Sequence, residues 1–206
     1  MKKIISLLVL SFIIISSTKA QNLYTAELQK NSSLTITGST NLLSFKLYQK
    51  DENLLKNKLI VAVTQSQNKL FLSQNQLTVL VNNFLSTNPM ALKDFLKLVK
   101  SDIYPTLQVQ INYLDLQPIS DKEQVKKGSV LASIKITGVT KFYTIPILFS
   151  SNGDIYTVNG NKKISIRDFG LTPQNKMMGI IKVSEWIDID FHMNYKITSE
   201  KNITKL

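Results

Sequence analysis

The side chains with the clearest chemical potential are three polar residues that alternate along one segment near the C-terminus. Asp188, Asp190 and His192 occupy every second position there. In a β-strand such residues share a face and lie roughly 6.5 to 7 Å apart, so Asp190 and His192 could supply two ligands to one metal ion. A third ligand would have to come from elsewhere. The alternative, which we favour, is that these residues form the polar outer face of a strand, with no metal bound.

Other catalytic arrangements are mostly excluded by the residue types that the chain contains. It has no cysteine and a single histidine, so a serine or cysteine nucleophile lacks the base that normally activates it. Residues 167–170 contain the Asp-Phe-Gly of protein kinases, but neither a glycine-rich loop nor a His-Arg-Asp segment accompanies them. We therefore expect a protein that is not an enzyme.

Residues 1–20 have the three parts of a secretory signal. Two lysines precede an apolar run over residues 4–15, and the small residues Thr18 and Ala20 stand at the cleavage positions. The apolar run is shorter than the roughly 20 residues that a membrane-spanning helix needs, which disfavours a membrane anchor. We expect cleavage after Ala20 and a mature chain, residues 21–206, that is periplasmic or secreted.

The composition predicts that the mature chain is one domain. Without cysteine there is no disulfide, so the stability must come from a sizeable core, and no Pro/Gly/Ser-rich linker divides the chain. The formal charge is +11, but Arg167 is the only arginine and the lysines are spread singly. Nucleic-acid binders usually concentrate such charge beside stacking aromatic residues. We expect no nucleic-acid partner, and a basic surface that could contact anionic surfaces of the cell envelope.

The elements that must position these residues are mostly β-strands. Apolar and polar side chains alternate, as in half-buried strands, over residues 59–64, 107–113 and 187–193. Residues 77–81 and 143–149 are apolar on both sides, which indicates strands covered on both faces, with Pro146 at an edge or a bulge. Residues 151–154, Ser-Asn-Gly-Asp, are the clearest hairpin turn.

One short unit, Ile-Thr-Gly-x-Thr, occurs twice, at residues 36–40 and 136–140. In each copy β-branched residues are followed by a glycine that can take a positive φ angle. We therefore expect each copy to be a strand that runs into a sharp turn or bulge and then resumes as strand.

One amphipathic helix interrupts the strands. Asn88 can cap it, Pro89 suits its first position and Pro105 limits it at the other end. Its apolar stripe, with Asp94 and three lysines opposite, consists of Met90, Leu92, Phe95, Leu96 and Val99. The helix could pack onto a sheet, or it could plug or gate one end of a barrel.

An ordered set of motifs resembles the YceI-like family. The motifs are residues 36–41 with Phe45, Met90 followed by residues 104–106, Gly128 with Leu131, and residues 136–141, 145–147, 166–171, 179–183 and 186–189. The resemblance covers roughly residues 24–195. It implies an all-β fold, a single antiparallel lipocalin-like β-barrel, whose apolar tunnel holds a polyisoprenoid or a related lipid. It also implies no catalytic residues, and we expect no cofactor.

The inward faces of the barrel strands are the candidates for a ligand site. One side of each strand faces the interior of a barrel, and the least polar faces are the best candidates for a tunnel lining. The predicted lining, including two helix residues, is Leu59, Val61, Val63, Phe95, Val99, Leu107, Val109, Ile111, Ile134, Ile136, Ile187, Ile189 and Phe191. The alternative is that these residues form an ordinary packed core. The protein would then be a structural or interaction module of the envelope without a ligand.

Overall fold

The computed structural model describes residues 22–55, 58–66, 69–116, 125–174 and 177–199. The signal expected in residues 1–20 lies outside these ranges. Within them β-strands dominate, and every pairing between named strands is antiparallel. The predicted all-β class is therefore confirmed. No helix among the described residues has the length and hydrophobicity that crossing a membrane would require.

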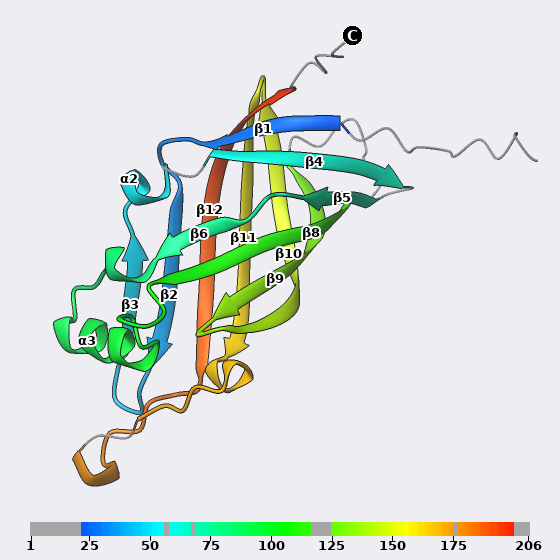
Figure 1. Cartoon of the computed structure of the whole chain (residues 1–206). Helices are drawn as coiled ribbons and strands as arrows, with labels where there is room; N and C mark the ends of the chain where they lie inside the picture. Colours follow the sequence, from blue (N-terminus) through cyan, green and yellow to red (C-terminus); the bar gives the residue numbers. More distant parts are fainter. Residues whose placement is uncertain (1–21, 56–57, 67–68, 117–124, 175–176, 200–206) are drawn as a thin grey trace, which may run out of the picture.

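Eight strands pair in a closed ring, which makes the sheet a barrel (Figure 1). In order around the ring they are β1 (Asn22–Leu28), β4 (Lys58–Ser66), β5 (Lys69–Ser73), β8 (Thr106–Leu116), β9 (Lys126–Ile136), β10 (Val139–Asn152), β11 (Ile155–Ser165) and β12 (Trp186–Ser199). The ring closes where the C-terminal half of β12 pairs with β1, with Tyr195 opposite Leu28. Closure pairs the strand edges and creates an interior, as the resemblance implied.

Further strands extend the wall at one end of the barrel. The N-terminal half of β12 pairs with β2 (Ser33–Ser39), which continues to β3 (Ser44–Gln49) and the short β7 (Phe84–Leu85). Strand β6 (Leu77–Leu80) pairs with the first half of β8, and β5 pairs with its second half. The remaining short elements are α2 (Asp51–Leu54), η1 (Val81–Asn83), η2 (Ile166–Phe169) and η3 (Met177–Gly179).

Helix α3 (Pro89–Leu98) lies at this same end, in the connection between β7 and β8 (Figure 1). The predicted cap is present, because Oδ1 of Asn88 accepts a hydrogen bond of 3.0 Å from the backbone N–H of Ala91. The ring of Phe95 meets Phe84 edge-on, with 5.2 Å between the ring centroids. The predicted stripe is wrong at its first residue, since Met90 is 65% exposed in the first turn.

The two copies of Ile-Thr-Gly-x-Thr have different structures. In the second copy Thr137 and Gly138 have φ angles of 47° and 83° and form the β9–β10 turn, as predicted. In the first copy the prediction is wrong, because β2 runs through Gly38 without a turn. Gly38 instead leaves room for Phe45, directly opposite on β3: an added Cβ would lie 2.7 Å from a ring carbon.

Two other predictions from the alternation need correction. The β8–β9 register shifts between Ile111 and Tyr113, so the Tyr113 ring does not continue the inward face and instead lies 4.6 Å from Nζ of Lys69. The strands expected to be covered on both faces are not, since Leu80 and Leu148 are exposed on the outer surface. Both strands belong to the barrel wall, so one face of each turns toward the interior and the other toward solvent.

The turn and proline signals in β10 are confirmed. Gly153, with a φ angle of 63°, forms the hairpin turn between β10 and β11. Pro146 lies one residue before the β10–β11 ladder begins at Ile147. Pro146 still pairs with Ser129 of β9, and its missing N–H is tolerated because no strand pairs with it on the β11 side.

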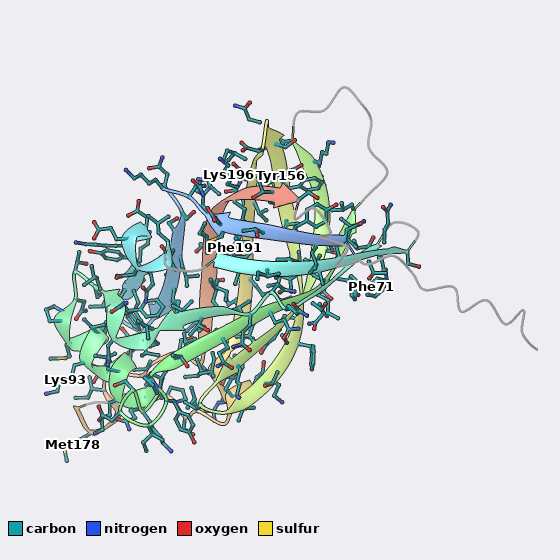
Figure 2. The ribbon with its side chains drawn as sticks, turned by 45° about the horizontal axis from the view of Figure 1, so that its top comes forward. Phe71, Lys93, Tyr156, Met178, Phe191 and Lys196 are labelled. Atoms are coloured by element: carbon teal, nitrogen blue, oxygen red, sulfur yellow. The ribbon has the colours of Figure 1, made fainter. Side chains whose placement is uncertain are left out.

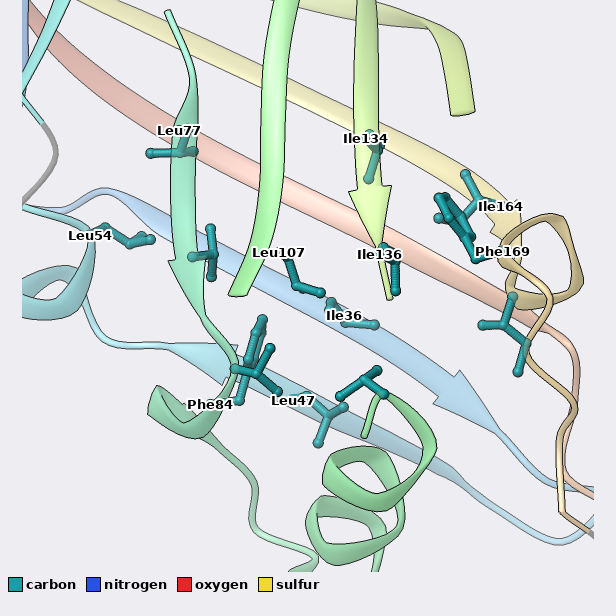
Figure 3. Close-up of a cluster of buried hydrophobic side chains, with 14 of the residues drawn as sticks. Ile36, Leu47, Leu54, Leu77, Phe84, Leu107, Ile134, Ile136, Ile164 and Phe169 are labelled. Atoms are coloured by element: carbon teal, nitrogen blue, oxygen red, sulfur yellow. The ribbon is translucent and has the colours of Figure 1, made fainter. Parts of the chain in front are cut away.

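The hydrophobic core gathers beneath α3 and the added strands (Figure 3). Leu77, Leu107, Ile134 and Ile136 project from β6, β8 and β9 toward the side chains of β2 and β3. The most completely buried large side chains are Leu47, Leu54, Val81, Phe84, Ile164 and Phe169. Their burial gives a chain without cysteine its main source of stability.

Candidate ligand-binding cavity

The barrel contains a cavity of about 750 Å³ whose wall is mainly apolar. Ligand sites for small molecules usually measure roughly 300 to 1,000 Å³. At roughly 30 Å³ for each water-sized group, the cavity has room for about 25 groups of methylene size. It is therefore large enough for a lipid chain.

All of the predicted lining residues lie on the wall of this cavity. They come from β4, β8, β9, β12 and the α3 segment, which the fold brings together around one space. Their inward direction follows from the period of two, because directly paired strands present the same face. That these residues contact a ligand stays a prediction.

Sequence reasoning missed a second group of apolar lining residues. They include Ala26, Leu34, Ile36, Phe45, Leu47, Leu77, Val79, Ile145, Ile147, Phe149, Met193 and Ile197. Continuing the alternation of β12 would have found Ile197. The short alternation on β3, with Phe45 and Leu47 on either side of Lys46, could have indicated its inward face as well.

The sequence pattern also assigned Asp94 wrongly. It was expected on the polar face of the helix, but it lines the cavity together with Phe95 and Val99. Helix α3 crosses the end of the barrel, so more than its apolar stripe borders the open space.

Tyr195 places a polar group inside the cavity. It lies directly opposite Tyr156 of β11 and Leu28 of β1. Burial raises the pKa of Tyr195 to about 12, so its hydroxyl is neutral and can donate a hydrogen bond at ordinary pH. Within the described part of the chain, we find no hydrogen-bond partner for this hydroxyl.

Asn75 fills a gap in the wall between two strands. Strand β5 ends at Ser73 and β6 begins at Leu77, which leaves Ile111 of β8 without a strand partner on that side. Nδ2 of Asn75 donates to the Ile111 carbonyl at 2.8 Å, and the Ile111 N–H donates to Oδ1 of Asn75 at 2.7 Å. The buried amide of Asn75 thus replaces the missing backbone partners of Ile111.

Side chains also connect β10 and β11 where their ladder ends. Beyond the pair Ile147–Gly160, Nζ of Lys162 donates to the Thr144 carbonyl at 3.0 Å. Nearby, the Tyr143 hydroxyl donates to Oδ2 of Asp168 at 2.8 Å. Burial, and then the hydrogen bond and the charge of Asp168, raise the pKa of Tyr143 far above its usual value.

Asp190 and His192, the candidate metal ligands, do not line this cavity and are already engaged with amides. Asp190 accepts a hydrogen bond of 2.6 Å from Asn161. Nδ1 of His192 lies 2.5 Å from Oδ1 of Asn159, and its Nε2 lies 3.2 Å from Nδ2 of Asn194. Among the residues that the structure describes, no group of three histidine or acidic side chains could hold a metal ion. The arrangement is that of a hydrogen-bonded outer face.

Comparison with solved structures establishes the fold. A polyisoprenoid-binding domain from Saccharophagus degradans, implicated in plant cell wall breakdown, has a TM-score of 0.57 and 13% identity, over 84% of this chain and 98% of its own. BcnA from Burkholderia cenocepacia has a TM-score of 0.56 and 19% identity, over 79% and 95%. A YceI protein from Campylobacter jejuni has a TM-score of 0.46 and 15% identity, over 69% and 81%.

No protein-family model and no curated protein matches the chain. The fold conclusion rests on the first two structures, each of which is covered almost completely. At 13% and 19% identity, these two structures establish the architecture of the chain and do not identify a ligand. The chain has the YceI-like β-barrel fold that its motifs indicated.

Proposed function

We propose that the protein binds a long apolar lipid of the polyisoprenoid class in the barrel cavity. The proposal rests mainly on one observation, the mainly apolar wall around a cavity of about 750 Å³. Burying a hydrocarbon chain there removes apolar surface from water, and it supplies the dispersion contacts that an empty cavity lacks. The Saccharophagus protein of the same fold is a polyisoprenoid-binding domain, which supports this class of ligand.

Tyr195 indicates how one end of the ligand is recognised. Its neutral hydroxyl lies on a mainly apolar wall, across from Tyr156, and would donate a hydrogen bond to an oxygen on the lipid. A ligand that carries a hydroxyl or carbonyl group therefore suits the cavity better than a plain hydrocarbon.

Binding rather than catalysis is the proposed activity. The ionisable side chains on the described wall are Tyr24, Asp94, Tyr156, Lys162 and Tyr195. Lys162 is held by the Thr144 carbonyl, and the described wall contains no histidine that could act as a general base for a nucleophile. The signal-like residues 1–20 support the further proposal that the binding protein is exported.

A length series of polyprenols tests the proposal. Each isoprene unit that enters adds about 3 to 4 kcal/mol of gross burial energy, at about 0.8 kcal/mol per CH₂. Ordering costs offset part of this gain, but affinity should still rise with length until the cavity is full, at roughly five units for about 25 groups. Displacement of a fluorescent lipid by each polyprenol measures this trend. Equal, weak binding at every length would contradict it and would favour a barrel that acts without a ligand.

A further inference from the structure

Two loops that are far apart in the sequence are hydrogen-bonded into one unit at the α3 end of the barrel (Figure 1). The N–H of Asn41 donates to the Lys182 carbonyl at 3.0 Å, and the Lys182 N–H donates to Oδ1 of Asn41 at 2.8 Å. Nδ2 of Asn41 also donates to the Ile180 carbonyl at 3.1 Å. The turn between β2 and β3 is therefore fixed to the loop that precedes β12.

This unit holds large apolar side chains in the solvent. Leu42 is 67% exposed and Ile180 is 66% exposed, and Leu43 and Met178 are also exposed. Oγ1 of Thr40 accepts the N–H groups of Leu42 and Leu43 at 3.2 and 3.1 Å, which fixes the turn in this conformation. Together with Met90 of α3, these side chains form what we call the apolar rim: Leu42, Leu43, Met90, Met178 and Ile180.

The apolar rim is continuous with the cavity. Leu42, Leu43 and Met90 line the same space as Val109 deep in the barrel, although all three are exposed to solvent. An apolar chain could therefore pass between the cavity and the outside along apolar side chains. Exposed apolar patches at such a position are typical of interaction sites.

Exposed lysines flank the apolar rim. Lys182 belongs to the tied loop, and Lys93 lies on the solvent side of α3. Figure 2 shows Lys93 and Met178 at the same end of the molecule. The nearby acid Glu185 is paired with Arg167. Exposed apolar side chains with lysines beside them match the surface of a bilayer, where acyl chains lie beneath anionic phosphates.

We propose that the apolar rim docks into the interface of an anionic lipid bilayer, with Lys93 and Lys182 against the phosphates. The cavity then opens toward the membrane, and its ligand can move between the two without entering water. This transfer of a ligand between membrane and cavity rests on the proposed lipid-binding function. The docking surface itself consists of the exposed apolar rim and its lysines, which lie outside the deep part of the cavity.

Flotation of the mature protein with lipid vesicles tests this proposal. Vesicles of phosphatidylcholine mixed with phosphatidylglycerol should bind the protein, and pure phosphatidylcholine should bind it at least tenfold more weakly. The double variant Leu42→Ser, Leu43→Ser should reduce binding to the mixed vesicles at least tenfold. Lys182→Glu should reduce it severalfold without disturbing the fold, because the backbone of Lys182, and not its side chain, makes the bonds to Asn41.

Matched controls come from the outer wall of the barrel. Ile60→Ser and Leu148→Ser also remove exposed apolar side chains, and they should leave vesicle binding unchanged. A thermal melt of each variant shows that the fold is kept. If the rim variants and the wall controls bind vesicles equally, the proposal is wrong.

Two further results separate docking from ligand binding. A parent protein that carries lipid but does not bind anionic vesicles would contradict the docking proposal and remain consistent with the proposed function. A parent that binds vesicles through the rim but never carries lipid would support docking and contradict the proposed function. If the rim variants instead dissociate a dimer in size-exclusion chromatography and no vesicle binding occurs, the rim is an interface between copies, and the docking proposal fails.

Discussion

Replacing a valine by phenylalanine at two positions distinguishes an open cavity from a packed core. Val109 lines the cavity on β8, whereas Val81 in η1 is 0% exposed and does not line it. The same change adds about four carbon atoms, and their volume, at each site. At Val109 this volume comes out of the space of about 750 Å³ that the ligand would use.

The two variants should differ in both stability and binding. Overpacking at Val81 should cost about 1 to 3 kcal/mol, which lowers the melting temperature by about 2 to 12 °C in a chain of this size. Val109→Phe should melt within about 2 °C of the parent, because its ring enters open space. It should bind lipid about a hundredfold more weakly, since about four CH₂ groups of ligand lose roughly 3 kcal/mol of burial.

Differential scanning fluorimetry and lipid displacement measure the two effects, and Val61→Phe on β4 provides a second cavity site. The reasoning is refuted if Val109→Phe melts as early as Val81→Phe and still binds lipid as tightly as the parent. Those results would mean that Val109 lies in an ordinary packed core.

Three other predictions follow from the wall and the N-terminal segment. Asn75→Ala should lower the free energy of unfolding by about 2 to 5 kcal/mol in urea titrations, because it leaves two buried backbone groups of Ile111 unpaired. The control Asn161→Ala removes an exposed hydrogen bond to Asp190 and should lower the free energy of unfolding far less. The pKa of Tyr195, raised to about 12, means that the folded state holds this proton more tightly than the unfolded state. The contribution of Tyr195 to stability should therefore be complete below pH 10 and be lost as the pH rises toward 12. In thermal melts at stepped pH, Tyr195→Phe should remove that part of the alkaline loss of stability. An unchanged alkaline profile in the variant would argue against a buried hydroxyl. Mass spectrometry of the exported protein should find Gln21 as the first residue, and intact Met1 protein in the membrane fraction would contradict cleavage.

The alternation of side chains predicted much of the cavity wall because a strand has a fixed period of two. It identified Leu59, Val109 and Ile189 as inward-facing without any knowledge of which strands pair. It failed at Tyr113, where the register shift depends on how β8 pairs with β9. Such irregularities are properties of a strand pair, so a single segment cannot reveal them.

Identical local sequence was not sufficient where a distant partner decides the structure. Gly138 turns the chain, whereas Gly38 stays in a strand and accommodates the ring of Phe45. The exposure of Leu42 likewise depends on bonds between Asn41 and a loop about 140 residues further along the chain. The apolar rim therefore became visible only in the folded structure.

Native mass spectrometry of the mature protein, purified without detergent from the cells that make it, tests the central claim most directly. Binding of a polyisoprenoid-like lipid predicts a mass above that of the polypeptide, and mild activation should release one apolar species. The species should be absent from the Val61→Phe, Val109→Phe double variant and retained by Val81→Phe. A parent protein that always has the mass of the polypeptide alone, and that takes up no polyprenol when one is offered, would contradict the account.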